Sequence, residues 1–454
     1  MEARRLSRRE FLKLAAVAGS GLAVASCVPV APAGAPAAAP AVAPTVAPAA
    51  PAAKQIVVNV LTQPRPEWEF MEKALPAFEE KSGIKVVFHY FAELERRSKS
   101  RLDAATGAGQ YQVYYVDEAN IAEFGSNKWL FPIKDYYPAD GDFAGFSQPL
   151  VKVLTYADVP YAAPMTFEGD VVFYRKDLFA ADKIAVPKNL DEYLAAAKHF
   201  HKPPEMYGTG TRGLRGSGMN VWRFSPYLLR FGGDWLDEAG NPIFNSPEAV
   251  KATEYYLELI KLSPSPTMSW SDVMDTFAAG KEAIVDFANL KMDTLMNPAK
   301  STIVDKMGYS KPPAGPAGEI ANNAVHGLGI SVSGAKTDEV RAAAGQFVGW
   351  FTSAQSEISK VKNGFGLTNA RTATFASPEF AAAYPPEFAK AQLDMMAIQR
   401  MCIPQIPQWP EIGDYFGIKL EEMSTQAFAG QKVAIQPALD DAVAYAKQVL
   451  AKKS

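Results

Sequence analysis

Cysteine and histidine are scarce in this sequence, with two and four residues respectively among 454. One cysteine, Cys27, lies at the end of an N-terminal leader, so the exported chain can form no internal disulfide and packing alone must hold it. Cys402, in the tetrapeptide MCIP, is predicted to be a buried apolar residue. The histidines show no H-E-x-x-H or other metal spacing, and we expect neither a metal nor another cofactor.

An excess of charge of one sign is also absent, because 46 lysine and arginine residues nearly balance 49 aspartate and glutamate residues. Such a chain has no strong field to attract nucleic acid, which is not expected as a partner. The 454 residues exceed the roughly 250–300 at which a single core stops growing, so two lobes are expected. We expect the partner to be a small molecule without high charge.

Several catalytic motifs are missing as well. The glycine spacing at Gly208–Gly213 matches G-x-G-x-x-G, but no apolar strand precedes it, which favours a flexible loop over a nucleotide site. No phosphate-binding lysine loop and no G-x-S-x-G elbow occur. Two pairs of carboxylates, Asp117 with Glu118 and Glu168 with Asp170, leave open acid/base work on a glycoside or hydrogen bonding to sugar hydroxyls.

The first 27 residues read as a targeting segment. Residues 7–13, SRREFLK, resemble the twin-arginine export signal, and the apolar run at 14–25 is too short to span a membrane. Residues 24–27, VASC, resemble a bacterial lipobox, in which Cys27 would be lipidated; the alternative is an ordinary cleaved signal. Residues 28–53 are nearly all Ala, Pro and Val and are expected to form an extended tether.

The order of the elements indicates an α/β fold. A strand at 55–61, a helix at 67–80 and a second strand at 84–91 form a βαβ unit, whose ligands gather at the carboxyl ends of the strands. We interpret Val159–Phe179 as the segment in which the chain crosses between lobes, extended at first, bent at Glu168–Asp170, and then a strand at 171–174. Ser246 and Pro247 have the residue types of a helix N-cap and first turn.

Polar residues at predicted strand ends, and aromatic residues beside polar ones, are the candidate binding residues. Carboxylate, amide and guanidinium groups bond sugar hydroxyls, and aromatic faces stack on the apolar faces of sugar rings. Trp68 and Trp235 are better explained as core residues. The candidates are Gln63, Arg65, Glu93, Asp117, Glu118, Phe167, Glu168, Trp222, Phe287, Asn289, Phe365 and Trp409.

From about Val57 onward the chain resembles the extracellular solute-binding proteins of ABC importers, the large family that includes the maltose-binding protein. No single motif is specific, but a series of segments keeps the family's order and approximate spacing. The segments that carry the resemblance are FEEKSGIKV (78–86), VPYAAPMTFEGDVVFYRKDLF (159–179), residues 231–260, FAAGKEAIVDF (277–287) and PQIPQW (404–409).

The resemblance implies a periplasmic-binding-protein type II fold, with two α/β lobes, each a mainly parallel sheet flanked by helices, joined by hinge strands. It implies lobe 1 at 54–162 and 309–352, and lobe 2 at 163–308 and 353–454. Gln63, Arg65, Glu93 and Asp117–Glu118 would face the cleft from lobe 1, and the other candidates from lobe 2. Trp409 falls where the family often places a sugar-stacking aromatic. Phe287–Leu290, FANL, stands where the maltose-binding protein has a tryptophan, which argues against maltose itself.

Our first hypothesis is therefore a monomeric, lipid-anchored, non-enzymatic receptor on the outer face of the cell membrane or in the periplasm. It would bind a carbohydrate and deliver it to the transmembrane subunits of an ABC permease. The near-neutral charge and the lack of an evident anion-binding arginine cluster favour a neutral polyol. The alternatives are the same fold with a peptide, polyamine or glycerophosphodiester ligand, or an exported glycoside-processing enzyme that uses Asp117 or Glu168.

Overall fold

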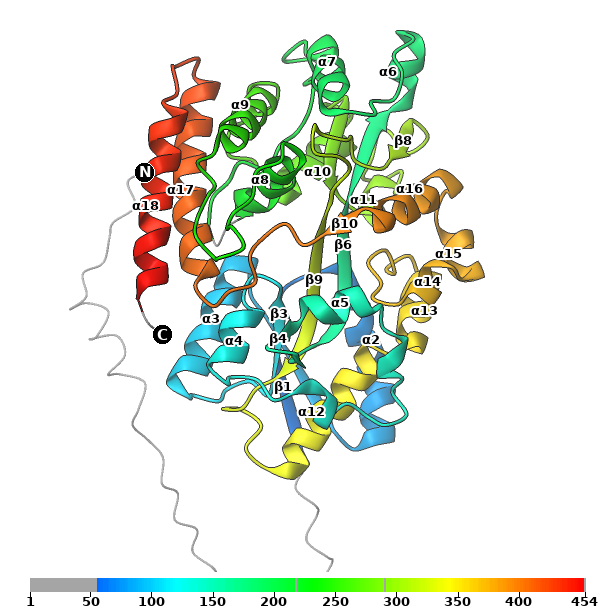
Figure 1. Cartoon of the computed structure of the whole chain (residues 1–454). Helices are drawn as coiled ribbons and strands as arrows, with labels where there is room; N and C mark the ends of the chain where they lie inside the picture. The colour runs from blue at the N-terminus through cyan, green and yellow to red at the C-terminus, as the bar shows by residue number, and fades with distance from the viewer. Residues whose placement is uncertain (1–54, 217–218, 290, 453–454) are drawn as a thin grey trace, which may run out of the picture. The chain divides into compact units, whose positions relative to one another are not determined.

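A computed structural model of the chain describes residues 55–216, 219–289 and 291–452, all of which belong to one compact unit, Lys54–Ser454 (Figure 1). The predicted export signal with Cys27 and the predicted tether lie outside the described residues. Within the described ranges, no helix combines the length and the apolar character needed to cross a membrane.

The structure contains both sheet and helix, as predicted. Its strands are β1 (Val57–Thr62), β2 (Lys85–Tyr90), β3 (Val113–Asp117), β4 (Thr155–Tyr156), β5 (Val159–Pro160), β6 (Ala163–Arg175), β7 (Ile284–Ala288), β8 (Met307–Ser310), β9 (Ala321–Ile330) and β10 (Gln399–Arg400). Its α-helices are α2 (Pro66–Ser82), α3 (Glu93–Thr106), α4 (Ile121–Ser126), α5 (Gln148–Val153), α6 (Lys176–Ala181), α7 (Leu190–Phe200), α8 (Met219–Arg230), α9 (Pro247–Lys261), α10 (Trp270–Ala278), α11 (Met292–Leu295), α12 (Asp338–Phe351), α13 (Ala354–Lys362), α14 (Thr372–Phe375), α15 (Pro378–Ala383), α16 (Pro386–Ala397), α17 (Trp409–Phe428) and α18 (Ile435–Ala451).

Eight of the strands form one mixed sheet in the order β2-β1-β3-β9-β6-β7, with β8 paired to β6 and β10 to β9, and β4 and β5 form a separate two-stranded sheet. Strand β1 is parallel to β2 and β3, which confirms the predicted βαβ unit. Strands β9, β7 and β8 all pair antiparallel with β6, and β9 also pairs antiparallel with β3. One end of the sheet is therefore parallel and the other antiparallel.

Strand β6 connects the two ends of the sheet. Its residues 163–169 pair with β9, and its residues 170–175 pair with β7 and β8. The predicted bend at Glu168–Asp170 is wrong, because the exchange of one partner strand for the next keeps the backbone hydrogen-bonded and extended through these residues. Figure 1 shows β6 and β9 running side by side along the length of the molecule.

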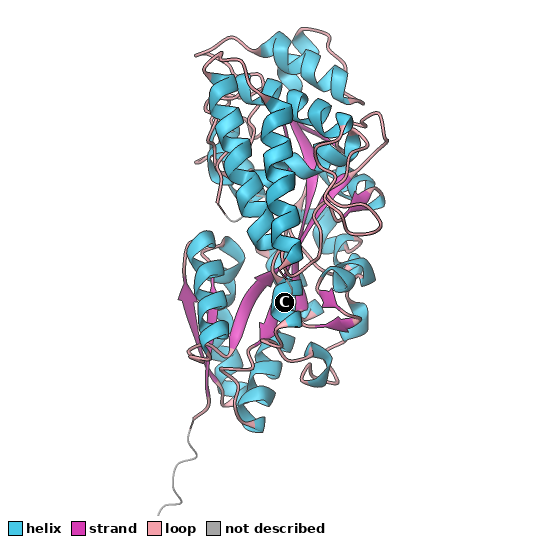
Figure 2. Cartoon of the chain, turned by 60° about the vertical axis from the view of Figure 1, so that its left-hand side comes forward, coloured by secondary structure: helices cyan, strands magenta, loops and turns pink. Residues whose placement is uncertain are grey.

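Helices gather around the two ends of the sheet (Figure 2). We call the part with β1–β3, α2–α4 and α12 the first lobe, and the part with β7, β8, α6–α11, α17 and α18 the second lobe (Figure 1). Helix α13, in the range predicted for lobe 2, packs against α2 of the first lobe. The two-lobed α/β architecture agrees with the prediction, whereas the exact lobe boundaries stay a prediction.

Local signals set the ends of several helices. The Ser246 hydroxyl accepts from the Ala249 amide and caps α9, with Pro247 at its first position, as predicted.

Trp68, Trp235 and Cys402 belong to the core, as predicted. Their exposed fractions are 0%, 1% and 1%. Burial raises the pKa of the Cys402 thiol to about 12, so the thiol stays protonated at neutral pH.

Candidate functional site

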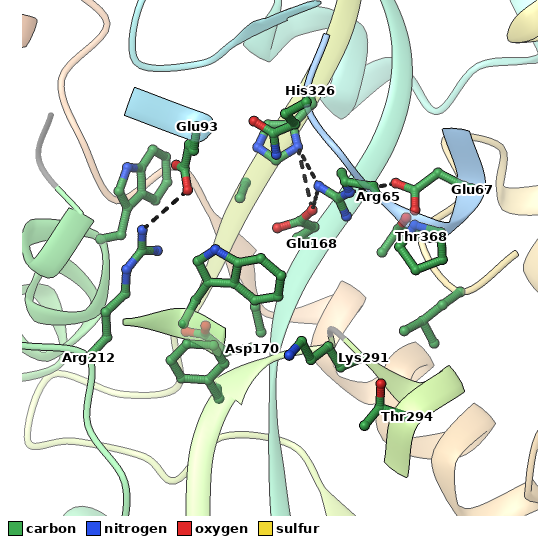
Figure 3. Close-up of a pocket in the computed structure, with 18 of the residues that line it drawn as sticks. Arg65, Glu67, Glu93, Glu168, Asp170, Arg212, Lys291, Thr294, His326 and Thr368 are labelled. Carbon is green, nitrogen blue, oxygen red and sulfur yellow. Dashed lines mark hydrogen bonds and ion pairs between the residues drawn. The ribbon is translucent and has the colours of Figure 1, made fainter. Parts of the chain in front are cut away.

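A cavity of about 280 Å³ lies where β6 passes between the lobes (Figure 3). The first lobe contributes the loop after β1 and the start of α3, and the second contributes the loop that carries Arg212, helix α8 and the segment after β7. Residues 364–368, between α13 and α14, close a further side. The loop after β1 and the start of α3 follow the carboxyl ends of the parallel strands β1 and β2, where such sheets present ligand-binding groups.

Eight of the twelve predicted site residues line this cavity although they are distant in sequence. They are Gln63, Arg65, Glu93, Glu118, Glu168, Trp222, Phe287 and Phe365. The structure thus brings most of the predicted residues into one pocket, and their contact with a ligand stays a prediction.

Phe167 and Asn289 lie away from the pocket wall. Successive side chains of a strand point to opposite faces, so Phe167 of β6 enters the core while Glu168 lines the cavity. Asn289 is fully buried, and its side-chain oxygen accepts from the Gly169 amide at 3.2 Å. Both residues support the strand that carries Glu168.

Asp117 and Trp409 line a second cavity of about 500 Å³ beside the first. Asp117 is fully buried beneath two guanidinium groups of α3. Trp409 is 4% exposed, and its ring meets that of Trp235 edge to face at a centroid distance of 4.9 Å. Arg97 and Trp222 line both cavities and so lie between them.

Arg65 is the centre of a charged cluster on one wall of the pocket (Figure 3). Its guanidinium lies 2.5 Å from a Glu168 oxygen and 2.6 Å from a Glu67 oxygen. The His326 Nδ1 lies 3.4 Å from the same Glu168 oxygen and 2.7 Å from the Tyr115 hydroxyl. Burial and the neighbouring Arg65 charge hold the pKa of His326 well below its usual value, so the imidazole is neutral at pH 7.

A second charged group lies at the start of α3. Arg96 and Arg97 contact the same Asp117 oxygen at 2.8 and 2.9 Å, and Arg97 also contacts Glu93 at 3.2 Å. Burial alone would raise the pKa of Asp117, but the two guanidinium groups hold it below its usual value. Glu93 faces Arg212 of the second lobe across 3.8 Å, so charges of both lobes meet in the pocket (Figure 3).

The floor of the pocket is built from a buried network of four charges. Arg223 binds both carboxylate oxygens of Asp170 at 3.0 and 2.8 Å, and Arg230 contacts Asp286 at 2.6 Å. All four side chains are at most 4% exposed. A paired, desolvated network of this kind fixes the positions of its members, so Asp170 is held at a defined place below the ligand space.

Aromatic rings form the remaining walls. Trp222, Trp270, Phe287 and Phe365 line the cavity, and Phe365 stacks on Phe70 of α2 at a centroid distance of 5.2 Å. The pocket therefore offers apolar faces beside charged donors and acceptors. This combination suits a molecule with many hydroxyl groups and C–H faces, because charged partners strengthen hydrogen bonds to hydroxyls. Among the described residues, no group of three or more metal-ligating side chains could hold a metal ion.

Several pocket residues are absent from the predicted set. They are Pro66, Glu67, Arg96, Arg97, Asp170, Arg212, Arg223, Trp270, Ala288, Lys291, Thr294, Lys300, Asn322, Ala324, His326, Gly364, Leu367 and Thr368. The expectation that the site contains no cluster of arginines is wrong, because Arg65, Arg96, Arg97, Arg212 and Arg223 meet there. They come from four separate segments, so no local run of positive charge reveals the cluster. Asp170, considered from the sequence only as the carboxylate partner of Glu168, lines the cavity because it shares the strand face of Glu168.

The loop with the G-x-G-x-x-G spacing carries Arg212 to the pocket. No strand precedes the loop, as predicted, and its glycines permit close packing. A Cβ at Gly210 would lie 2.4 Å from the Glu282 carboxyl, and one at Gly213 would lie 1.9 Å from the Pro266 carbonyl. The Tyr256 hydroxyl donates to the Arg212 carbonyl at 2.6 Å. These contacts fix the loop against the second lobe, so the expectation of a flexible loop is wrong.

The chain is similar to one protein family and to several individual proteins. Residues 67–358 match the family described as bacterial extracellular solute-binding protein. The mannitol-binding protein of Pseudomonas aeruginosa is 25% identical over 411 residues, which are 84% of this chain and 89% of that protein.

Two solved structures of ABC transporter solute-binding proteins are similar over 87% of this chain and 98% of theirs. One, from Agrobacterium vitis with bound D-mannitol, is 26% identical with a TM-score of 0.76. The other, from Agrobacterium radiobacter in complex with ribitol, is 23% identical with a TM-score of 0.79, a likeness of fold.

Proposed function

Because the chain belongs to the bacterial extracellular solute-binding proteins, we propose that it captures a carbohydrate of the open-chain polyol type between its lobes and delivers it to an ABC permease. It is a binding protein and not an enzyme. The observation that carries the proposal is the pocket itself, in which ion-paired carboxylates and guanidinium groups alternate with aromatic rings. The relatives that bind mannitol support the choice of polyol.

The size of the cavity favours a small ligand. Its volume of about 280 Å³ lies just below the roughly 300–1,000 Å³ typical of ligand pockets. A single sugar or a six-carbon polyol fits this space better than an oligosaccharide does. An extended ligand would need the second cavity, on the other side of Trp222.

The charged groups are arranged to bind hydroxyls without further ordering. Each hydroxyl can donate to a carboxylate such as Glu168 or Asp170 and accept from a guanidinium such as Arg65. Since these partners are already held by one another, their side chains lose little freedom when a ligand arrives. The walls come from both lobes, so a bound ligand contacts both and favours the closed arrangement.

The N-terminal residues support a location outside the cytoplasm. We propose that SRREFLK at 7–13 directs export by the twin-arginine route and that Cys27 is lipidated, which would anchor the protein to the membrane. Residues 28–53 would then act as the tether, with a reach of ~80 Å at ~3.1 Å per residue. A monomer on such a tether can search locally for its permease.

Calorimetric titration of the purified protein tests the proposed ligand class. Mannitol, ribitol, glucitol, the matching aldoses and maltose form the carbohydrate arm, and a dipeptide, spermidine and a glycerophosphodiester form the second arm. We expect binding in the carbohydrate arm, weakened at least about tenfold in Glu168→Gln, which loses a charge-assisted acceptor. Binding confined to the second arm would contradict the proposal, and turnover of a glycoside would contradict the non-enzymatic assignment.

A further inference from the structure

Arg212 differs from the other buried cations of the pocket in its lack of a close carboxylate. Arg65, Arg96, Arg97, Arg223 and Lys291 each have a carboxylate oxygen within 2.9 Å. Among the described residues, the carboxylate oxygen that comes closest to the Arg212 guanidinium is that of Glu93 at 3.8 Å, which is beyond hydrogen-bond distance. In the described part of the chain, Arg212 is therefore the buried pocket cation whose charge is least compensated.

Two side-chain nitrogens of Arg212 are also without a hydrogen-bond partner among the described residues. Its Nε and Nη2 are buried and have no hydrogen-bond partner among the described residues, and its side chain is 12% exposed. Burial holds the pKa of this guanidinium below its usual value, and the Glu93 charge offsets the effect only in part. Buried donors without acceptors are costly, so a ligand that supplies acceptors here gains affinity.

Glu93 already forms an ion pair with another cation. It lies closer to Arg97, at 3.2 Å, than to Arg212. Arg96 and Arg97 already pair with the carboxylates of Asp117 and Glu93, so neither carboxylate is left to pair with Arg212 alone.

In the part of the chain that the structure describes, the nearby Glu118 forms no ion pair with Arg212. Its carboxylate accepts from the Val325 amide at 2.9 Å, and burial together with the Asp117 charge raises its pKa well above the usual value. Its ionised form is therefore disfavoured, so Glu118 is a poor partner for Arg212 and leaves a place for a negative group of the ligand.

We propose that Arg212 receives the anionic group of the ligand, and that the ligand class is therefore a sugar acid, an open-chain polyol with one carboxylate. The inference rests on the proposed function and narrows it. A carboxylate can take two parallel hydrogen bonds from a guanidinium, and the fixed Arg212 loop presents that group without reorganisation. The hydroxyls of the same ligand would reach Glu168 and Asp170 on β6.

Matched pairs of ligands that differ only at one terminal carbon test the proposal. Calorimetry on the full chain compares mannitol with mannonate, glucitol with gluconate, and ribitol with ribonate. We expect the tightest ligand to be an acid, bound at least about tenfold more tightly than its polyol, because a charge-assisted pair is about twice as strong as a neutral one.

Variants separate the role of Arg212 from a general effect of charge. Arg212→Met should abolish the preference for the acid, Arg212→Lys should retain part of it, and Arg215→Met should leave it unchanged. Arg215 lies in the same loop, is 51% exposed and is not among the pocket residues. Circular dichroism verifies that each variant is folded, and the Lys variant tests the charge should the Met variant unfold.

The outcomes are distinct. If the polyols bind as tightly as their acids, or if Arg212→Met weakens both members of a pair equally, the inference is overturned while the proposed function stands. If no polyol, aldose or acid binds, the proposed function fails and the inference fails with it.

Discussion

Glu282, two residues before β7, should make the protein less stable as the pH rises. Its side chain is fully buried, and neither carboxyl oxygen has a hydrogen-bond partner in the part of the chain that the structure describes. Burial raises the pKa of this carboxyl well above its usual value. Gly210, in the loop that carries Arg212, packs directly on the Glu282 carboxyl. Ionisation of Glu282 should therefore also disturb this loop.

The sign of the effect follows from linkage. The folded chain holds the Glu282 proton more tightly than the unfolded chain does, so the stabilisation is complete below the unfolded-state pKa and is lost as the pH rises towards the folded-state pKa. Within that window each pH unit costs about 1.4 kcal/mol. For a unit of about 400 residues, with an unfolding entropy near 0.84 kcal/mol/K, the cost corresponds to about 1.6 °C in Tm.

Thermal unfolding followed by circular dichroism between pH 5 and 8 measures the effect. Glu282→Gln keeps the shape of the side chain and cannot ionise. The Tm of this variant minus the Tm of the wild type should therefore increase by about 1.6 °C for each unit of rising pH. Glu205→Gln, at an exposed glutamate of the preceding segment, is the control and should follow the wild type. A constant difference between Glu282→Gln and the wild type across this range would refute the reasoning.

Three further sets of substitutions test the buried charge network below the pocket, the aromatic residues of the two cavities and the predicted lipid anchor. Asp170→Asn leaves Arg223 without its bidentate partner and should lower the free energy of unfolding by about 3–5 kcal/mol, measured as a fall in Tm of about 4–6 °C; an unchanged Tm would show that the network is not needed for stability. Trp222→Ala should weaken carbohydrate binding at least about fivefold, measured by calorimetry, whereas Trp409→Ala should have the same effect only for a ligand that enters the second cavity; equal losses for a six-carbon ligand would contradict its confinement to the first. Cys27→Ser should move the protein from the membrane fraction to the soluble fraction after cell lysis, and a protein that remains in the membrane fraction would argue against a lipid anchor.

Local features of the fold could be predicted because they depend on neighbouring residues. The βαβ unit follows from the apolar spacing of 55–91, and the start of α9 follows from Ser246 and Pro247. The continuity of β6 could not be predicted in the same way, since polar residues at 168–170 are typical of a turn. They stay extended because β7 continues the pairing where β9 leaves it, which is a tertiary effect.

The residues of the candidate site also fall into two groups, those that could be predicted from the sequence and those that only the tertiary fold brings to the pocket. Residues at the carboxyl ends of strands, such as Gln63 and Arg65, could be placed from topology alone. Arg212 and His326 could not, because a loop of the second lobe and a strand paired with β3 and β6 bring them to the pocket. Phe167 shows what alternation adds: once Glu168 faces the ligand space, its neighbour must face the core.

A thermal-shift screen of the purified protein against polyols, sugar acids, aldoses and non-sugar solutes tests directly whether the protein binds an open-chain carbohydrate. A ligand that binds the folded protein alone, at a hundred times its Kd, adds about 2.7 kcal/mol and should raise the Tm by about 3 °C. We expect such a rise for at least one open-chain carbohydrate, and in Glu168→Gln a rise of at most about half that size at the same ligand concentration, because binding is at least about tenfold weaker. A screen in which a peptide or polyamine raises the Tm and no carbohydrate does would contradict it.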